Sequence, residues 1–145
     1  ITTVELKADS PATDVCGTCT LCIDACPTGA IVEPYVVDSR RYISYQTIEN
    51  RGEIPARLHA DHGAWVFGCD ICQDVCPWNR FARESTEEAF RPRDGHANPD
   101  LDLLARMDEP SFNAEFAGSP VRRTKHAGMM RNAAIARKNA DAGGD

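Results

Sequence analysis

Short apolar segments separated by polar residues run through this chain, and they predict short helices with little β structure. Residues 31–37 are expected to form a short extended segment. Beyond them, Ile43, Thr47 and Ile48 have helical spacing, and Asp38 or Ser39 can cap the start of the helix that carries them to about residue 49. The pattern therefore predicts one helix in the middle of the first half of the chain.

From residue 98 onward, helix start signals follow one another closely. The predicted helices run over about 98–107, 111–118, 119–127 and 129–138. Ser119 followed by Pro120 is the strongest start signal, because serine caps free backbone N–H groups and proline fits the first helical turn. Gly128 is expected to separate the last two helices. Short helices in succession favour a helical-repeat region, of which about one or two repeats would be present.

Charge adds a local feature to this picture. The 145 residues carry a formal net charge of −6, so nothing global indicates binding to nucleic acid. Residues 116–140, however, contain six Lys or Arg and no Asp or Glu, whereas the rest of the chain holds all 22 acids and 10 bases. Such a stretch is either a phosphate-binding surface or an ordinary solvated face.

The cellular setting follows from simple exclusions. No apolar run is long enough to cross a membrane, and the first residues do not form a signal peptide. An odd number of cysteines in close-set runs argues against a secreted disulfide framework and favours the reducing cytoplasm. The chain starts at Ile1 without an initiator methionine, and we therefore expect a fragment of a longer protein.

All seven cysteines lie in two runs, each followed by proline. The runs are Cys16, Cys19, Cys22 and Cys26 before Pro27, and Cys69, Cys72 and Cys76 before Pro77. The first run has the spacing of bacterial ferredoxins, in which three cysteines hold one cubane iron–sulfur cluster and the fourth serves the other cluster. Two such clusters need eight thiolates, one more than the chain offers.

Reciprocal ligation is the simplest arrangement of these thiols. Cys76 would complete the first cluster, with Cys16, Cys19 and Cys22. The second cluster would use Cys26, Cys69, Cys72 and one further ligand, since Val66 occupies the position where a ferredoxin has its extra cysteine. Zinc is the alternative, but two four-cysteine zinc sites would also need eight thiolates, and a single site would leave three thiols idle.

A resemblance to a known family rests on four segments. They are residues 16–31, 40–49, 68–80 and 118–134. Together they resemble the epoxyqueuosine reductases, cobalamin-dependent iron–sulfur enzymes that complete queuosine in tRNA. The resemblance implies a mainly α fold, with a two-cluster ferredoxin-like domain over 1–95 and the start of a HEAT-like helical-repeat domain over 96–145. The cobalamin domain of the family would precede this segment, which would then be inactive alone.

The same resemblance implies the reaction and the partners. An external donor would pass electrons through two 4Fe–4S clusters to cobalamin, which reduces epoxyqueuosine to queuosine at the tRNA wobble position. The protein would be a cytoplasmic monomer that does not bind membranes. Alternatives are a ferredoxin-like electron carrier, the cluster module of a cobalamin reductive dehalogenase, and a zinc-bound RNA-binding module. The basic C-terminal helices argue against a simple carrier.

The resemblance also assigns individual residues. The family has cysteine where Tyr42 stands, so the last ligand of the second cluster could be Tyr42, water, Asp70 or a nearby histidine such as His59 or His62. The cluster could instead be 3Fe–4S, the site could be degraded, or the sequence could be locally wrong. Ser44, Arg51 and Asp70 match cobalamin contacts, although each could equally be an ordinary polar surface residue. In the basic stretch, tRNA contacts are expected at Arg122, Arg123, Lys125 and Arg131.

Overall fold

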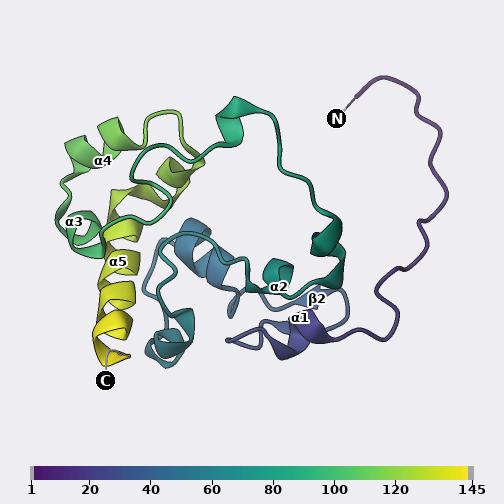
Figure 1. Cartoon of the computed structure of the whole chain (residues 1–145), viewed down its shortest axis with the longest axis horizontal. Coiled ribbons are helices and arrows are strands. Elements are labelled where there is room, and N and C mark those ends of the chain that lie inside the picture. The colour runs from purple at the N-terminus through teal and green to yellow at the C-terminus, as the bar shows by residue number, and fades with distance from the viewer. Residues whose placement is uncertain (1, 144–145) are drawn as a thin grey trace.

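The structure, a computed structural model, describes residues 2–143 and is mainly helical with very little strand (Figure 1). Its elements are α1 (Leu21–Asp24), β1 (Ile31–Glu33), β2 (Val36–Val37), α2 (Ile71–Asp74), α3 (Leu101–Arg106), α4 (Glu109–Glu115) and α5 (Lys125–Ala142). Single 3₁₀ or π-helical turns lie between them. The predicted fold class is therefore confirmed in its helix-rich character. The HEAT-like repeat and the boundary at residue 95 stay predictions.

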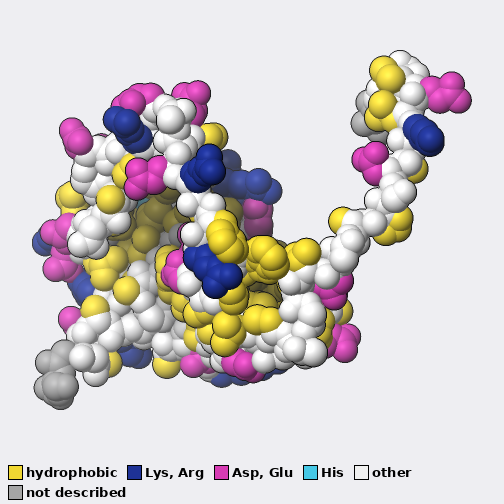
Figure 2. Space-filling view, turned by 45° about the vertical axis from the view of Figure 1, so that its right-hand side comes forward, with side chains coloured by type: hydrophobic (Ala, Val, Ile, Leu, Met, Phe, Trp, Pro, Cys, Tyr) yellow, Lys and Arg dark blue, Asp and Glu magenta, His cyan; other side chains and the backbone are white. Residues whose placement is uncertain are grey.

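Residues 2–15 form an extended arm that projects from the body of the molecule (Figure 2). Near the end of the arm, the carboxylate of Asp14 accepts a hydrogen bond of 2.6 Å from the hydroxyl of Tyr35. This bond raises the pKa of the Tyr35 phenol to about 12. Tyr35 lies in the turn of an antiparallel hairpin in which Ile31 of β1 faces Val37 of β2. The segment predicted as extended over 31–37 therefore folds back on itself, with Tyr35 at a positive φ in the turn.

The central helix begins later than the sequence predicts. Asp38 does not cap it, because its carboxylate accepts from the backbone and the guanidinium of Arg40 in a local turn. The helix starts at Ile43 and continues as a π-helical turn, Tyr45–Glu49. Its widened backbone is seen in the bond of 3.0 Å from the N–H of Asn50 to the carbonyl of Tyr45.

The C-terminal helices begin at aspartates that the sequence analysis passed over. Asp100 caps α3, and Asp108 caps α4 by accepting from the N–H of Ser111 at 2.8 Å. Ser119 and Pro120 open only a 3₁₀ turn, Pro120–Thr124. These starts move by a few residues, and the short helices predicted near 98–107 and 111–118 are confirmed as α3 and α4.

Gly128 does not separate two helices, because α5 runs through it without a break. A Cβ at this position would lie 3.0 Å from the side chain of Thr124. The glycine therefore allows close packing of the preceding turn on α5. The prediction of a helix stop was wrong, since a glycine inside a helix can also mark a close approach.

One small apolar core holds the C-terminal helices together. It is built from Leu104 of α3, Phe112 of α4, Phe116, Met129 and Ala133, all buried. Val66, three residues before Cys69, packs against this core as well. The two halves of the chain therefore share apolar contacts. No helix among residues 2–143 has the length and apolar character required to traverse a bilayer.

His62 is a buried titratable group in the first half of the chain, with only 1% of its surface exposed. Its Nδ1 lies 2.6 Å from the carbonyl of Leu58, which identifies Nδ1 as the donor. Within the described chain, Nε2 has no hydrogen-bond partner. Burial lowers the pKa of His62, because a second proton would place a charge in the interior. The positive charges of His59 and Arg131 lower it further, whereas the hydrogen bond to Leu58 and the carboxylate of Asp61 raise it.

The first prediction concerns the pH dependence of stability. Between the lowered pKa of folded His62 and its ordinary value of about 6.5, the unfolded chain binds more protons than the folded chain. The free energy of unfolding should therefore fall as the pH drops below about 6.5 and level off below the folded pKa. Urea unfolding across this range should show that slope, and His62→Phe should reduce it. An unchanged slope in the variant would contradict the assignment.

Candidate iron–sulfur and RNA-binding site

The two cysteine runs fold into the same local structure. In each run, a single helical turn carries the next-to-last cysteine: α1 carries Cys22 and α2 carries Cys72. The residues before the turns, Thr20 and Asp70, have φ/ψ of −119°/7° and −112°/9°. The residues after them, Ala25 and Val75, have −82°/−10° and −82°/−9°. The chain thus contains two copies of one ligand-bearing turn, and α1 packs against α2 (Figure 1).

The last cysteine of the first run lies beside the second run. Burial raises the pKa of the Cys69 thiol, and the neighbouring thiols of Cys72 and Cys26 raise it further, against the backbone hydrogen bond from Ile71. Cys26 and Cys69 are 43 positions apart in the chain, but α1 and α2, which follow the two runs' first cysteines, pack against each other. The proximity is the one that the predicted ligand set of the second cluster requires.

Cys26 also has a hydrogen bond that suits a thiolate ligand. The backbone N–H of Ala30 donates to its Sγ at 3.2 Å. Burial opposes ionisation of Cys26, but backbone donors at Ile31 and Ala30 and the Thr28 hydroxyl together lower the pKa of the thiol. Bonds of this kind stabilise the ligating form and tune the iron–sulfur centre that it would hold.

The two ends of the cysteine segment are joined by a tryptophan. The indole Nε1 of Trp78 donates to the carbonyl of Val15 at 3.2 Å. Val15 precedes Cys16, and Trp78 comes two residues after Cys76. The bond therefore holds the beginning of the first run next to the end of the second, as the predicted first cluster requires.

The donor set fits polynuclear clusters better than a single ion. Cys16 and Cys19 are exposed, and the other five thiols are half-buried. Within residues 2–143, no three His, Cys, Asp or Glu side chains lie close enough to share one metal ion. Soft thiolates are the ligands of iron–sulfur clusters, and the spacing of the first run is that of bacterial ferredoxins. Soft thiolates in two repeated turns thus fit two iron–sulfur clusters.

Tyr42 lies next to the exit of the first cysteine run. Its neighbour Arg41 places a guanidinium nitrogen 3.2 Å from where a Cβ of Gly29 would be, and Gly29 has φ of +57°. The segment carrying Tyr42 therefore packs against the turn that follows Cys26. The side chain of Tyr42 keeps 36% of its surface exposed. Its role as the last ligand of the second cluster stays a prediction.

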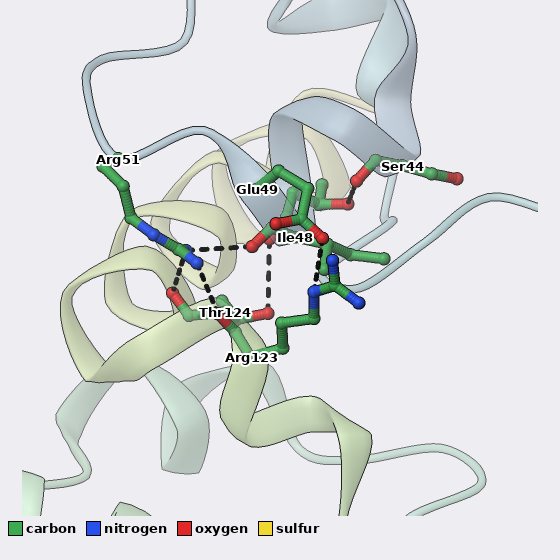
Figure 3. A network of polar contacts seen from close by, with 7 residues as sticks. Ser44, Ile48, Glu49, Arg51, Arg123 and Thr124 are labelled. Carbon is green, nitrogen blue, oxygen red and sulfur yellow. Dashed lines mark hydrogen bonds and ion pairs between the residues drawn. The ribbon is translucent and has the colours of Figure 1, made fainter. Parts of the chain in front are cut away.

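The predicted cobalamin contacts have distinct surroundings (Figure 3). The guanidinium of Arg51 donates to the carbonyls of Ile48 at 2.9 Å, Thr124 at 3.2 Å and Arg123 at 2.9 Å. Arg51 thus joins the central helix to the turn before α5. Ser44 lies one residue before the π-helical turn, and Asp70 is exposed at the start of α2.

The basic stretch has an exposed part and an internal part. Arg122, Arg123 and Lys125 are exposed around the 3₁₀ turn, and Nε of Arg123 forms an ion pair of 2.5 Å with Glu49 (Figure 3). All three line a cleft of about 380 Å³. Lys125 has φ/ψ of 64°/159°, a region of backbone space that is strained for residues with a side chain.

Arg131 belongs to the internal part. Its guanidinium donates to the carbonyls of Gln46 at 2.7 Å, Asn50 at 3.0 Å and Gly52, and it also contacts the side chain of Asn132. These bonds occupy the guanidinium N–H groups with which Arg131 would otherwise bind two oxygens of a phosphate. The structure therefore gives Arg131 a structural role in place of the tRNA contact that the sequence analysis expected.

Comparison with known proteins agrees with this geometry. Residues 15–79 match the 4Fe-4S double cluster binding domain family. An epoxyqueuosine reductase of Synechocystis sp. is 51% identical over 135 residues, which are 92% of this chain and 47% of that protein. The enzyme of Escherichia coli is 47% identical over 94% of this chain and 36% of its own length. The chain is homologous to epoxyqueuosine reductases.

Solved structures lead to the same family. A crystal structure of epoxyqueuosine reductase with an epoxyqueuosine-modified tRNA-Tyr stem loop superposes with a TM-score of 0.84, at 33% identity over 92% of this chain. The reductase of Streptococcus thermophilus superposes with a TM-score of 0.80, at 28% identity over 94% of this chain. The chain spans about 35–36% of those two proteins and less than half the length of the curated relatives that it matches.

Sequence reasoning missed the polar residues that join the two halves of this chain. Asn132 and Thr47 are both 1% exposed and make hydrogen bonds between the two halves of the chain. Their only signal in the sequence was an Arg-Asn pair inside a helix and a threonine among apolar helix positions. Neither pattern distinguishes a buried polar bridge from an exposed polar face.

Proposed function

We propose that this chain is the electron-transfer and tRNA-binding part of an epoxyqueuosine reductase. The observation that supports it most directly is the repeated cysteine turn, whose two copies, α1 and α2, pack against each other. Similarity over more than nine-tenths of the chain adds the reaction class. The full enzyme would remove the epoxide oxygen of epoxyqueuosine as water, which consumes two electrons and two protons. It would act in the cytoplasm as a monomer.

Each group of residues has a separate part in this proposal. The thiolates of Cys16, Cys19, Cys22 and Cys76 would hold one cluster, and those of Cys26, Cys69 and Cys72 the other. When bound, the clusters supply one-electron transfer from an external donor toward cobalamin. The N–H of Ala30 favours the thiolate form of Cys26. Ser44 and Asp70 are the free candidates for cobalamin contacts, whereas Arg51 would contribute through its remaining nitrogen.

Metal content tests the cluster assignment. Anaerobic reconstitution should load about seven or eight irons per chain with matching sulfide, the lower value applying if the second cluster is 3Fe–4S. The protein should then show the visible absorption of iron–sulfur clusters. Stoichiometric zinc without visible absorption would overturn the assignment, and one cluster in place of two would overturn the reciprocal ligand scheme.

RNA binding tests the second part of the proposal. Each phosphate that an arginine contacts releases counterions, so lost contacts weaken binding and flatten its salt dependence. Arg122→Glu with Arg123→Glu should weaken binding of a tRNA anticodon stem loop about tenfold or more and reduce the salt slope by about 1 per lost contact. Fluorescence anisotropy over a series of salt concentrations measures both quantities.

A matched control lies in the same basic stretch. Arg137 pairs with Asp102 at 3.0 Å near the other end of α5, and Lys138 follows it. Reversing the charges of Arg137 and Lys138 changes the net charge equally but should leave the salt slope close to that of the unmodified chain. Equal effects of the two double variants would indicate a general charge effect and would count against a defined RNA surface at Arg122 and Arg123.

A further inference from the structure

Thr47 occupies a junction between three segments of the chain. Its hydroxyl donates to the carbonyl of Ile43 at 2.8 Å and accepts from the backbone N–H of Gly68 at 3.0 Å. Its carbonyl accepts from the hydroxyl of Thr124 at 3.3 Å and from Nδ2 of Asn132 at 2.8 Å. Thr47, which belongs to the central helix, is therefore hydrogen-bonded to two other parts of the chain. One is α5 together with the turn before it, and the other is the segment that leads into the second cysteine run.

Asn132 holds the same entering segment from the other side. Its Nδ2 donates to the carbonyl of Val66 at 2.9 Å as well as to Thr47, and its Oδ1 accepts from Arg131. With both Val66 and Gly68 hydrogen-bonded, the backbone is fixed on either side of Phe67. The next residue after Gly68 is Cys69, a proposed ligand of the second cluster.

The backbone at this point leaves Cys69 little freedom. Gly68 has φ of +73°, a conformation that glycine adopts without strain, so the chain turns sharply just before the ligand. The N–H bond from Gly68 to Thr47 fixes the peptide plane there and hence the direction in which the neighbouring residue leaves the turn. Groups that orient metal ligands in this way tune the affinity and potential of the metal centre.

We propose that Thr47 and Asn132 are positioning residues for the second iron–sulfur cluster. They hold residues 66–68 so that the thiolate of Cys69 points toward the position shared with Cys26 and Cys72. Among residues 2–143, no hydrogen bond joins α5 to the first cysteine run. This inference rests on the two clusters of the proposed function, and on no other part of it.

Substitution at Thr47 provides the first test. Thr47→Val keeps the shape but removes both bonds of the hydroxyl, whereas Thr47→Ser keeps the hydroxyl. In the reconstituted full chain, Thr47→Val should change the EPR signal and shift the midpoint potential of one cluster, and Thr47→Ser should restore both. The affected cluster is identified as the one whose signal is lost in Cys72→Ala. An unchanged signal and potential in Thr47→Val would overturn the proposal, and so would a change in both clusters.

Asn139 offers a matched control for Asn132. It also lies on α5, and its Nδ2 likewise donates to two backbone carbonyls, those of His59 at 2.6 Å and Gly63 at 2.8 Å. Neither of these residues adjoins a cysteine. Asn132→Ala should alter the second cluster or prevent its loading while the first loads normally, and Asn139→Ala should leave both cluster signals unchanged. Equal changes in the two variants would mean that α5 only stabilises the fold.

The outcomes separate this inference from the proposed function. If the unmodified chain loads no iron–sulfur cluster, the proposed function itself fails. If both clusters load and Thr47→Val leaves them unchanged, only the positioning role is overturned. If Asn132→Ala does not fold, the comparison of Val and Ser at position 47 decides the question, because both of those variants keep a side chain of nearly the same size.

Discussion

Arg131→Ala is expected to lower the free energy of unfolding by about 3–4 kcal/mol, on the scale of two or more charged hydrogen bonds. The arginine donates to the carbonyls of Gln46, Asn50 and Gly52, and these acceptors belong to the other half of the chain. Alanine would leave them without their donor in a partly buried setting, where an unpaired polar group is costly. Urea unfolding, followed by circular dichroism under anaerobic conditions, measures the difference.

The expected loss follows from the surroundings of Arg131 and not from its charge alone. Burial lowers the pKa of its guanidinium, with Arg51 acting in the same direction and Glu53 opposing them. A lysine at this position would keep the charge but could not reach three carbonyls with one ammonium group, so Arg131→Lys should recover only a minor part of the stability. Full recovery by lysine would show that charge, and not the planar fork, holds the two halves together.

Arg137→Ala is the matched control on the same helix. Its ion pair with Asp102 joins two side chains that are 52% and 55% exposed, and exposed pairs of this kind contribute about 0–1 kcal/mol. The control should therefore change the free energy of unfolding by less than about 1 kcal/mol. Similar losses in the Arg131 and Arg137 variants would contradict the role of Arg131 as a bridge between the halves.

Local patterns in the sequence predicted the outline of the fold. The helices near 98–107 and 111–118 were confirmed because short-range signals, capping residues and proline, determine them, whereas residues 31–37 were predicted as one extended segment and form a hairpin. The exact helix starts were wrong where several residues could cap. Asp100 and Asp108 hold the caps expected near Asn98 and at Ser111, since neighbouring polar side chains compete for the same free N–H groups.

In the candidate site, too, features set by local sequence were predictable and features set by distant contacts were not. Cysteine spacing is a local pattern, so it predicts the two groups of candidate iron ligands without knowledge of how the turns pack. The role of Arg131 could not be predicted, because its acceptors lie 79 to 85 positions away in the sequence. A stretch of basic residues without acids does not show which of its side chains face the interior and which face solvent. Only the packing of α5 on the central helix separates Arg131 from the exposed Arg122 and Arg123.

Tyr42→Cys should have the largest effect on the clusters. With a cysteine at position 42, the chain has eight thiolates, enough for two complete 4Fe–4S clusters. Thiolate binds iron more strongly than water or a phenol in such clusters and changes the net charge, so the reduction potential of the completed cluster should shift. Iron analysis should give about eight irons per chain, and EPR should change for the second cluster only.

Tyr45→Cys is the control for this substitution. Tyr45 lies three residues further along the same segment and is 40% exposed, close to the 36% of Tyr42. The substitution adds a thiol of similar accessibility where the family resemblance places no ligand. It should leave the iron content and both EPR signals unchanged. A gain of iron in this variant would mean that any nearby thiol can be recruited, and the special position of residue 42 would be lost.

The response of the unmodified chain distinguishes the possible ligands at this position. If the phenolate of Tyr42 binds iron, Tyr42→Phe should lower the iron content or convert the second cluster to 3Fe–4S, and a phenolate-to-iron absorption band should disappear. If water or Asp70 completes the cluster, Tyr42→Phe should have no effect, and Asp70→Asn then separates these two ligands. Because Tyr42→Cys supplies a thiolate in every case, it should produce the same complete cluster from each starting state. A response of both clusters, or of neither, would contradict the assignment of residue 42 to the cluster of Cys26, Cys69 and Cys72.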